Sequence, residues 1–130
     1  MRSVIIAGSR SVSPAVLDID EAIRLLDPGG LLWVPSEWTE VVCGGARGAD
    51  SAGEDWAKHH GISVAYDLVL PADYHQHGKL APKIRNRRMA ERADAALIFW
   101  DGMSGGSADM CCRMVARGKP VAVIPWRSSR

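Results

Sequence analysis

Glycine-rich segments, two of which contain arginine, stand directly after apolar runs of this sequence. The segment VVCGGARGAD, residues 41–50, carries three glycines and Arg47 behind a short apolar run, and GSR, residues 8–10, ends an apolar run near the N-terminus. A third segment, DGMSGGS, covers residues 101–107. Glycine lets the backbone turn tightly or approach a ligand closely, and arginine binds anions through several N–H donors. These segments are therefore candidates for holding a phosphate group.

Neither standard phosphate-binding motif is present. The sequence contains no GxGxxG, and GGARGADS (44–51) lacks the lysine of a Walker A loop, which disfavours a classical NAD dehydrogenase and a P-loop NTPase. One glycine-rich segment alone is weak evidence for a ligand, because any tight turn can require glycine. Three such segments at one edge of a fold are stronger evidence, and their position depends on the elements around them.

Apolar runs alternate with helical patterns along the chain. Buried strands are predicted at residues 3–8, 41–43, 62–66, 95–100 and 121–125, and helices lie between them, the first starting at Ser13 and Pro14. Strands that are apolar on both faces and alternate with amphipathic helices indicate a parallel sheet covered on both sides. With right-handed crossovers, we expect a single α/β domain over residues 1–130, a Rossmann-like doubly wound sheet of about five strands in the order 3-2-1-4-5 with helices on both faces.

This strand order brings the glycine-rich segments together. The strands at 3–8, 41–43 and 95–100 are neighbours in it, so the segments that follow them converge at the carboxyl edge of the sheet, where ligands bind in such folds. Two of the segments lead into helix N-termini, whose free N–H groups and dipole favour an anion. The convergence predicts a phosphate-bearing ligand at this edge.

Composition narrows the classes of partner and location. The chain has 130 residues, 47% of them hydrophobic, and no apolar run near the ~20 residues of a membrane span or long enough for a signal peptide. A cytoplasmic protein with no membrane partner is therefore expected. The three cysteines, Cys43, Cys111 and Cys112, suit that compartment as buried thiols. Homo-oligomer formation stays open.

One segment concentrates positive charge in a chain whose net charge is only +1. Residues 79–92, KLAPKIRNRRMAER, hold six of the 16 Lys and Arg residues and one of the 15 Asp and Glu residues. A local basic helix indicates a small anionic ligand or a short nucleic-acid contact. Arg88 and Arg92 are interpreted as solvated side chains. Asn86 interrupts an apolar stripe, so it needs a ligand or a loop as its hydrogen-bond partner.

A metal site is not predicted. Asp73, His75 and His77 lie together in a polar segment, but two histidines two positions apart are too few ligands for a closed site. No cofactor is expected either.

Taken as an ordered set, four motifs carry a family resemblance. GSR, CGGARGAD, RNRRM and FWDGMSGGSADM resemble the YspA/YpsA-related branch of the SLOG superfamily, over about residues 4–124. That superfamily has a Rossmann-like fold and includes the Lonely-Guy phosphoribohydrolases and the DNA-processing protein DprA. The resemblance implies binding of a nucleotide or a nucleotide-derived ligand such as ADP-ribose, NAD or a nucleoside monophosphate.

The resemblance also implies which residues bind that ligand. They belong to the three glycine-rich segments and the basic helix: Gly8, Ser9, Arg10, Gly44, Gly45, Arg47, Gly48, Asp50, Arg85, Asn86, Asp101, Ser104, Gly105, Gly106 and Ser107. Asp50 also suits a helix N-cap, which is the more common use of aspartate there. Ser107 stands where the branch has threonine and keeps the hydroxyl group.

The catalytic residue of the Lonely-Guy enzymes has no counterpart. These enzymes need a glutamate three residues beyond that threonine, and this chain has Met110 there, with Asp109 one residue early. A one-residue shift turns a helical side chain by ~100°. A carboxylate stabilises the oxocarbenium-like state of N-glycosidic cleavage, so binding is favoured over turnover. Arg85 and Asp109 are the catalytic candidates for one alternative, a phosphoribohydrolase-like enzyme. A DprA-like DNA-binding module is the other alternative.

Overall fold

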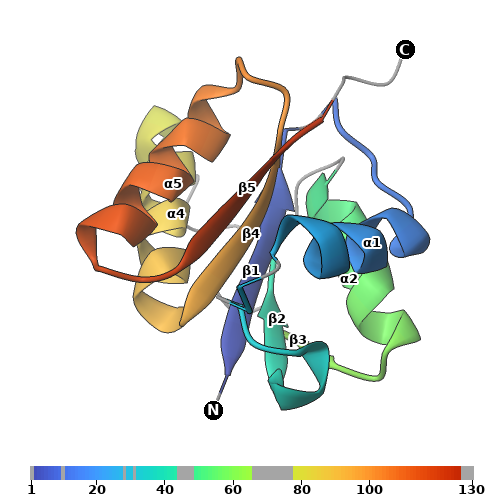
Figure 1. Cartoon of the computed structure of the whole chain (residues 1–130). Helices are drawn as coiled ribbons and strands as arrows, with labels where there is room; N and C mark the ends of the chain where they lie inside the picture. The colour runs from blue at the N-terminus through green and yellow to red at the C-terminus, as the bar shows by residue number, and fades with distance from the viewer. Residues whose placement is uncertain are drawn as a thin grey trace.

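A parallel sheet runs through the protein, and helices cover both of its faces (Figure 1). This computed structural model describes residues 2–9, 11–27, 29–30, 32–43, 49–65 and 78–126, without the side chains of Leu26, Ala49, Asp50 and Lys79. The strands are β1 (Ser3–Gly8), β2 (Glu40–Val42), β3 (Ser63–Ala65), β4 (Ala95–Trp100) and β5 (Val121–Pro125). They pair in parallel in the order β3-β2-β1-β4-β5, so the predicted fold class and strand order are confirmed.

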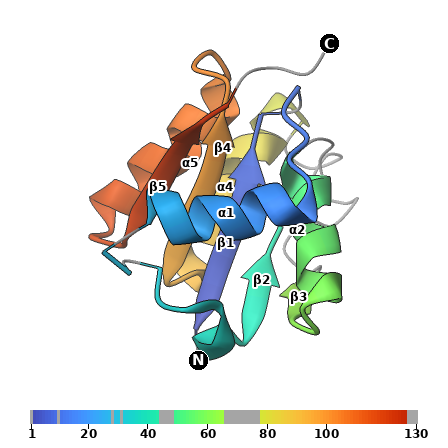
Figure 2. The ribbon, with the colours of Figure 1, turned by 45° about the vertical axis from the view of Figure 1, so that its right-hand side comes forward.

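The helices lie in two layers. Helices α1 (Val16–Leu26) and α2 (Ala49–His59) cover one face of the sheet, and α4 (Ala81–Arg92) and α5 (Gly105–Ala116) cover the other (Figure 2). Short 3-10 helices span Pro35–Glu37 and Gly78–Leu80. No helix within the described ranges is both long and apolar enough to cross a membrane.

Two apolar clusters hold the layers together because β1 alternates between them. Val4 and Ile6 are buried in the cluster under α1 and α2, whereas Ile5 is buried in the cluster under α4 and α5. A central parallel strand buried on both faces reads as a continuous apolar run, which is the pattern at residues 3–8. Trp56, a fully buried side chain of α2, belongs to the first cluster.

Helix α2 lies unusually close to the central strand. A Cβ atom placed on Gly53 would come within 2.8 Å of Ile6 Cγ2 and 2.9 Å of Ile6 Cβ. Only glycine fits this contact without a shift of the helix or of the buried Ile6 side chain.

The register of β1 and β4 keeps their carboxyl ends level. Gly8 pairs with Phe99, and the Ser9 N–H continues the ladder by donating to the Phe99 carbonyl at 3.0 Å. The segments that follow the two strands therefore begin side by side. This register is what brings the first and third glycine-rich segments to one place.

Two local predictions are wrong. Helix α1 begins at Val16 rather than at Ser13 and Pro14, and the Asp18 carboxylate, not the Ser13 hydroxyl, accepts a hydrogen bond at its start, from the Ala15 N–H at 2.8 Å. The cysteines also differ in exposure: Cys43 is buried as expected, but Cys112 is exposed, because it lies on the outer side of α5.

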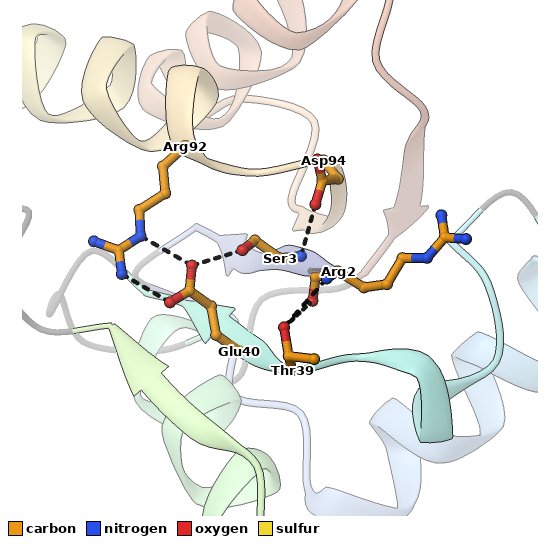
Figure 3. A network of polar contacts seen from close by, with 6 residues as sticks. All are labelled: Arg2, Ser3, Thr39, Glu40, Arg92 and Asp94. Atoms are coloured by element: carbon orange, nitrogen blue, oxygen red, sulfur yellow. Dashed lines mark hydrogen bonds and ion pairs between the residues drawn. The ribbon is translucent and has the colours of Figure 1, made fainter.

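A polar network closes the amino edge of the sheet (Figure 3). The buried Glu40 carboxylate accepts hydrogen bonds from Ser3 Oγ at 2.6 Å, from Arg92 Nε at 2.9 Å and from Arg92 Nη2 at 2.8 Å. Asp94 accepts from the Ser3 N–H at 2.9 Å. The expectation that Arg92 is a solvated residue is therefore wrong: it connects the last turn of α4 to β2.

Candidate functional site

A cavity of about 410 Å³ lies at the carboxyl edge of the sheet, between the ends of β1 and β4 and the helices α4 and α5. Its volume falls within the roughly 300–1,000 Å³ that small-molecule sites usually have. The lining residues come from four consecutive stretches: Ala7, Gly8, Ser9 and Ser11; Pro82, Arg85, Asn86 and Met89; Asp101 and Ser104; Gly106, Ser107 and Met110. The cavity is thus placed at the edge where the sequence predicts a ligand.

Most of the predicted site residues that the structure describes line this cavity. They are Gly8, Ser9, Arg85, Asn86, Asp101, Ser104, Gly106 and Ser107. Gly105 is not among the lining residues, although it stands between two of them at the start of α5. These residues are spread over the chain from position 8 to position 107. The parallel pairing of β1 with β4 and the packing of α4 beside α5 bring them together.

The remaining predicted residues lie outside the described part of the chain. This holds for Arg10 and for the second glycine-rich segment, with Gly44, Gly45, Arg47 and Gly48. Asp50 belongs to the first turn of α2, but its side chain is not described. Asp73, His75 and His77 also lie outside the described ranges. Within those ranges, no group of three or more His, Cys, Asp or Glu side chains could hold a metal ion.

Asp101 organises the turn between β4 and α5. Its Oδ1 accepts hydrogen bonds from the N–H groups of Met103 at 2.9 Å and Ser104 at 2.8 Å, and its Oδ2 accepts one from Ser11 Oγ at 3.0 Å. The two backbone N–H groups, with smaller contributions from Ser9 and Ser11, lower the pKa of Asp101 from 3.8 to about 2. The carboxylate is therefore ionised at neutral pH and ties the β1 segment to the α5 turn.

The first turn of α5 offers backbone N–H groups that Asp101 does not use. The first intrahelical bond, from the Ala108 N–H to the Ser104 carbonyl, is 3.3 Å long, so the N–H groups of residues 105–107 have no acceptor within the helix. A Cβ atom on Gly105 would meet no atom within 4 Å, and one on Gly106 only Ser104 Oγ at 4.0 Å. No side chain therefore crowds these two glycines, and Gly106 and Ser107 bring this helix N-terminus to the cavity, where it favours negative charge.

Helix α4 contributes a cation and an amide to the opposite wall. Arg85 is partly buried, and Asn86 is only 4% exposed. Asn86 Nδ2 donates to the Gly106 carbonyl at 3.2 Å and to Asp109 Oδ2 at 3.0 Å. The polar residue in the apolar stripe of α4 therefore has its protein partners on α5, and it lines the cavity as well.

Met110 and Asp109, the two residues at or next to the position of the Lonely-Guy glutamate in the motif comparison, differ in their position relative to the cavity. Met110 is buried and lines the cavity, whereas Asp109 does not line it and accepts hydrogen bonds from Asn86 and from Arg113 Nε at 2.8 Å. Burial raises the pKa of Asp109, but the hydrogen bonds from Arg113 and Asn86 and the charges of Arg113 and Lys83 outweigh it, so the net pKa is lowered. The carboxylate is an ionised partner of α4 rather than a free general acid.

Sequence reasoning missed part of the cavity lining. Ser11 lies one position beyond the GSR segment, and its contact with Asp101 depends on the β1–β4 register. Met89 stands three positions after Asn86, a spacing that places both on one helix face. This spacing could have indicated that Met89 lines the cavity beside Asn86. Trp100, which ends β4, donates its indole N–H to the Ser104 carbonyl at 2.9 Å, so it supports the α5 turn from outside the lining.

Comparison with known proteins finds similarity to a phage protein. The Gene 61 protein of Mycobacterium phage D29 is 37% identical to this chain over 129 residues, which cover 93% of this chain and 94% of the phage protein. No family model matches the sequence, and no solved structure matches it.

Proposed function

We propose that this chain, which belongs to the same family as the Gene 61 protein of Mycobacterium phage D29, binds a nucleotide or a nucleotide-derived small molecule such as ADP-ribose, NAD or a nucleoside monophosphate. The observation that carries the proposal is the cavity at the carboxyl edge of the sheet, where the open first turn of α5 faces Arg85 on α4. The motif resemblance to the SLOG superfamily supports the same class of ligand.

The phosphate group belongs at the first turn of α5. Asp101 already uses the N–H groups of Met103 and Ser104, so the donors for an anion are those of residues 105–107 and the Ser107 hydroxyl. Arg85 supplies the positive charge from the facing helix. A helix N-terminus with an arginine opposite to it favours a phosphate over a neutral group.

Binding is favoured over hydrolysis by the position of the carboxylates. Asp109 is held by Asn86 and Arg113, and Asp101 is held by two backbone N–H groups and Ser11. Met110, which the motif resemblance aligns with the enzymes' glutamate, lines the cavity and carries no carboxylate. A sensing or sequestering role therefore accounts for the residues better than N-glycosidic cleavage.

Calorimetry with AMP, ADP, cyclic nucleotides, ADP-ribose and NAD tests the proposal. We expect saturable binding of at least one compound, and a loss of about ten- to hundredfold in affinity for Arg85→Ala, because a charge-assisted hydrogen bond contributes about 1.5–3 kcal/mol. Arg87→Ala is the matched control: Arg87 lies on the same helix, is 54% exposed and pairs weakly with Glu91 at 3.8 Å. Absence of binding across the whole panel would overturn the proposal.

The same variants separate a cavity from a nucleic-acid surface. A DNA-binding helix acts through several arginines together, so binding of single-stranded oligonucleotides falls steeply with salt, and each arginine removed lowers the slope by about one unit or slightly less. We expect weak, salt-sensitive oligonucleotide binding at most. Equal weakening by Arg85→Ala, Arg87→Ala and Arg88→Ala, without nucleotide binding, would favour the DprA-like alternative.

A further inference from the structure

Asn86 is held in one orientation by two groups that can only accept hydrogen bonds. Its side chain lies 3.2 Å from the Gly106 carbonyl oxygen and 3.0 Å from Asp109 Oδ2. A carbonyl and a carboxylate both require a donor, so the amide nitrogen must face them. The reversed amide would place Oδ1 against two oxygens. The chemistry of the partners therefore assigns Nδ2 and Oδ1 without ambiguity.

Both N–H donors of this amide are consequently used by the protein, and its carbonyl oxygen is not. Among the described residues, Asn86 forms no hydrogen bond through Oδ1. The side chain is 4% exposed and lines the cavity. Asn86 Oδ1 is not among the buried side-chain atoms of the described residues that lack a partner, so this oxygen keeps solvent access and can accept a hydrogen bond from a molecule in the cavity.

Asp109 and Arg113 keep the amide in this orientation. Arg113 Nε donates to Asp109 Oδ2 at 2.8 Å, and the same oxygen accepts from Asn86. The lowered pKa of Asp109 agrees with a carboxylate that remains ionised and cannot donate in return. The chain of contacts runs along one face of α5 and ends at the cavity wall on α4.

We infer that Asn86 Oδ1 accepts a hydrogen bond from an O–H or N–H group of the bound ligand, and that Asp109 and Arg113 are positioning residues that present this oxygen. The inference rests on the proposed function and narrows it. The ligand carries, beside its phosphate, a hydrogen-bond donor that reaches α4. A ribose hydroxyl and the amino group of a base share this chemistry, and analogues distinguish them.

Four probes test the acceptor on the unmodified protein. AMP is compared by calorimetry with 2′-deoxy-AMP, 3′-deoxy-AMP and inosine monophosphate, which lack the 2′-hydroxyl, the 3′-hydroxyl and the 6-amino donor respectively. We expect one analogue to bind roughly 5- to 100-fold more weakly than AMP, because it leaves Oδ1 unsatisfied, and the other two to bind within about threefold. Asn86→Ala should remove the preference.

The outcomes separate this inference from the proposed function. If AMP binds and all three analogues bind equally well, the acceptor role is overturned while nucleotide binding stands. If AMP does not bind, the inference is overturned for adenosine phosphates, and the wider nucleotide panel decides the proposed function. If the preference persists in a folded Asn86→Ala variant, another residue reads the donor.

The positioning role needs a readout that a purely structural role would leave alone. Asp109→Ala removes one of the two acceptors that orient the amide and leaves only the Gly106 carbonyl at 3.2 Å. The amide is then held less firmly, so the ratio of affinities for AMP and the discriminated analogue should fall. Arg87→Ala, on the exposed side of α4, should keep the ratio. If Asp109→Ala weakens binding of AMP and the analogue by the same factor and keeps their ratio, Asp109 acts only on stability and the positioning role is overturned.

Discussion

Arg92 and Glu40 form a two-point ion pair across 52 positions of sequence, at 2.8 and 2.9 Å, at the end of the sheet opposite the cavity. Arg92 lies in the last turn of α4, the helix whose earlier turns carry Arg85 and Asn86. Glu40 begins β2 and also accepts from Ser3 of β1. One end of α4 is thus tied to the two strands while its other end forms a wall of the cavity.

Removal of this ion pair should destabilise the protein. Arg92→Ala leaves the nearly buried Glu40 carboxylate with a weaker set of donors, and we expect the free energy of unfolding to fall by about 1–3 kcal/mol. Urea denaturation followed by circular dichroism measures the change. Arg87→Ala, which removes an exposed pair on the same helix, should alter it by no more than about 0.5 kcal/mol. Equal effects of the two variants would show that the Glu40 contact contributes nothing specific.

Acid should weaken the fold partly through Asp101. The native pKa of about 2 lies below the ordinary value of 3.8, so the ionised carboxylate stabilises the folded state above about pH 4, and this contribution is lost as the pH falls from 4 to 2. Asp109, whose pKa is also lowered, adds to the loss in the same direction. Urea midpoints measured across this range should fall less steeply for Asp101→Asn than for the unmodified chain. Parallel pH profiles would contradict the assignment.

Gly53→Ala should destabilise the protein although alanine is the better helix former. The new Cβ would lie 2.8 Å from Ile6 Cγ2, and overpacking in a core costs about 1–3 kcal/mol, which exceeds the ~1 kcal/mol gain in helix propensity. We expect a net loss of up to about 2 kcal/mol in thermal or urea denaturation. Ser51→Ala, at an exposed position of α2, should stay within about 0.5 kcal/mol. A stabilised Gly53→Ala variant would mean that α2 does not pack this closely on β1.

Release of adenine from AMP should stay at background. Met110 offers no carboxylate to the cavity, and Asp109 is engaged by Asn86 and Arg113. Chromatography of reaction mixtures measures free base over long incubations. Turnover that disappears in Asp109→Asn would show instead that Asp109 reaches the substrate and that the chain is a hydrolase.

Local patterns in the sequence were sufficient to predict the strands of the sheet and their order. The apolar runs at 3–8, 95–100 and 121–125 coincide with β1, β4 and β5. The order β3-β2-β1-β4-β5 follows because right-handed crossovers leave few arrangements for alternating strands and helices. That order alone brings the ends of β1 and β4 together, so Gly8, Ser9 and the segment from Asp101 to Ser107 could be placed at one edge without a structure.

The partners of individual polar side chains depended on the tertiary structure. Arg92 was expected to be solvated, but it forms an ion pair with Glu40. Asn86 donates hydrogen bonds to Gly106 and Asp109 of α5. Each helical residue turns by about 100°, so a small rotation of α4 on the sheet would exchange which side chains face α5, β2 or solvent. Packing of the apolar residues Met89 and Ala90 against the sheet selects that rotation. The partners lie 20 to 52 positions away in sequence, beyond the reach of any local pattern.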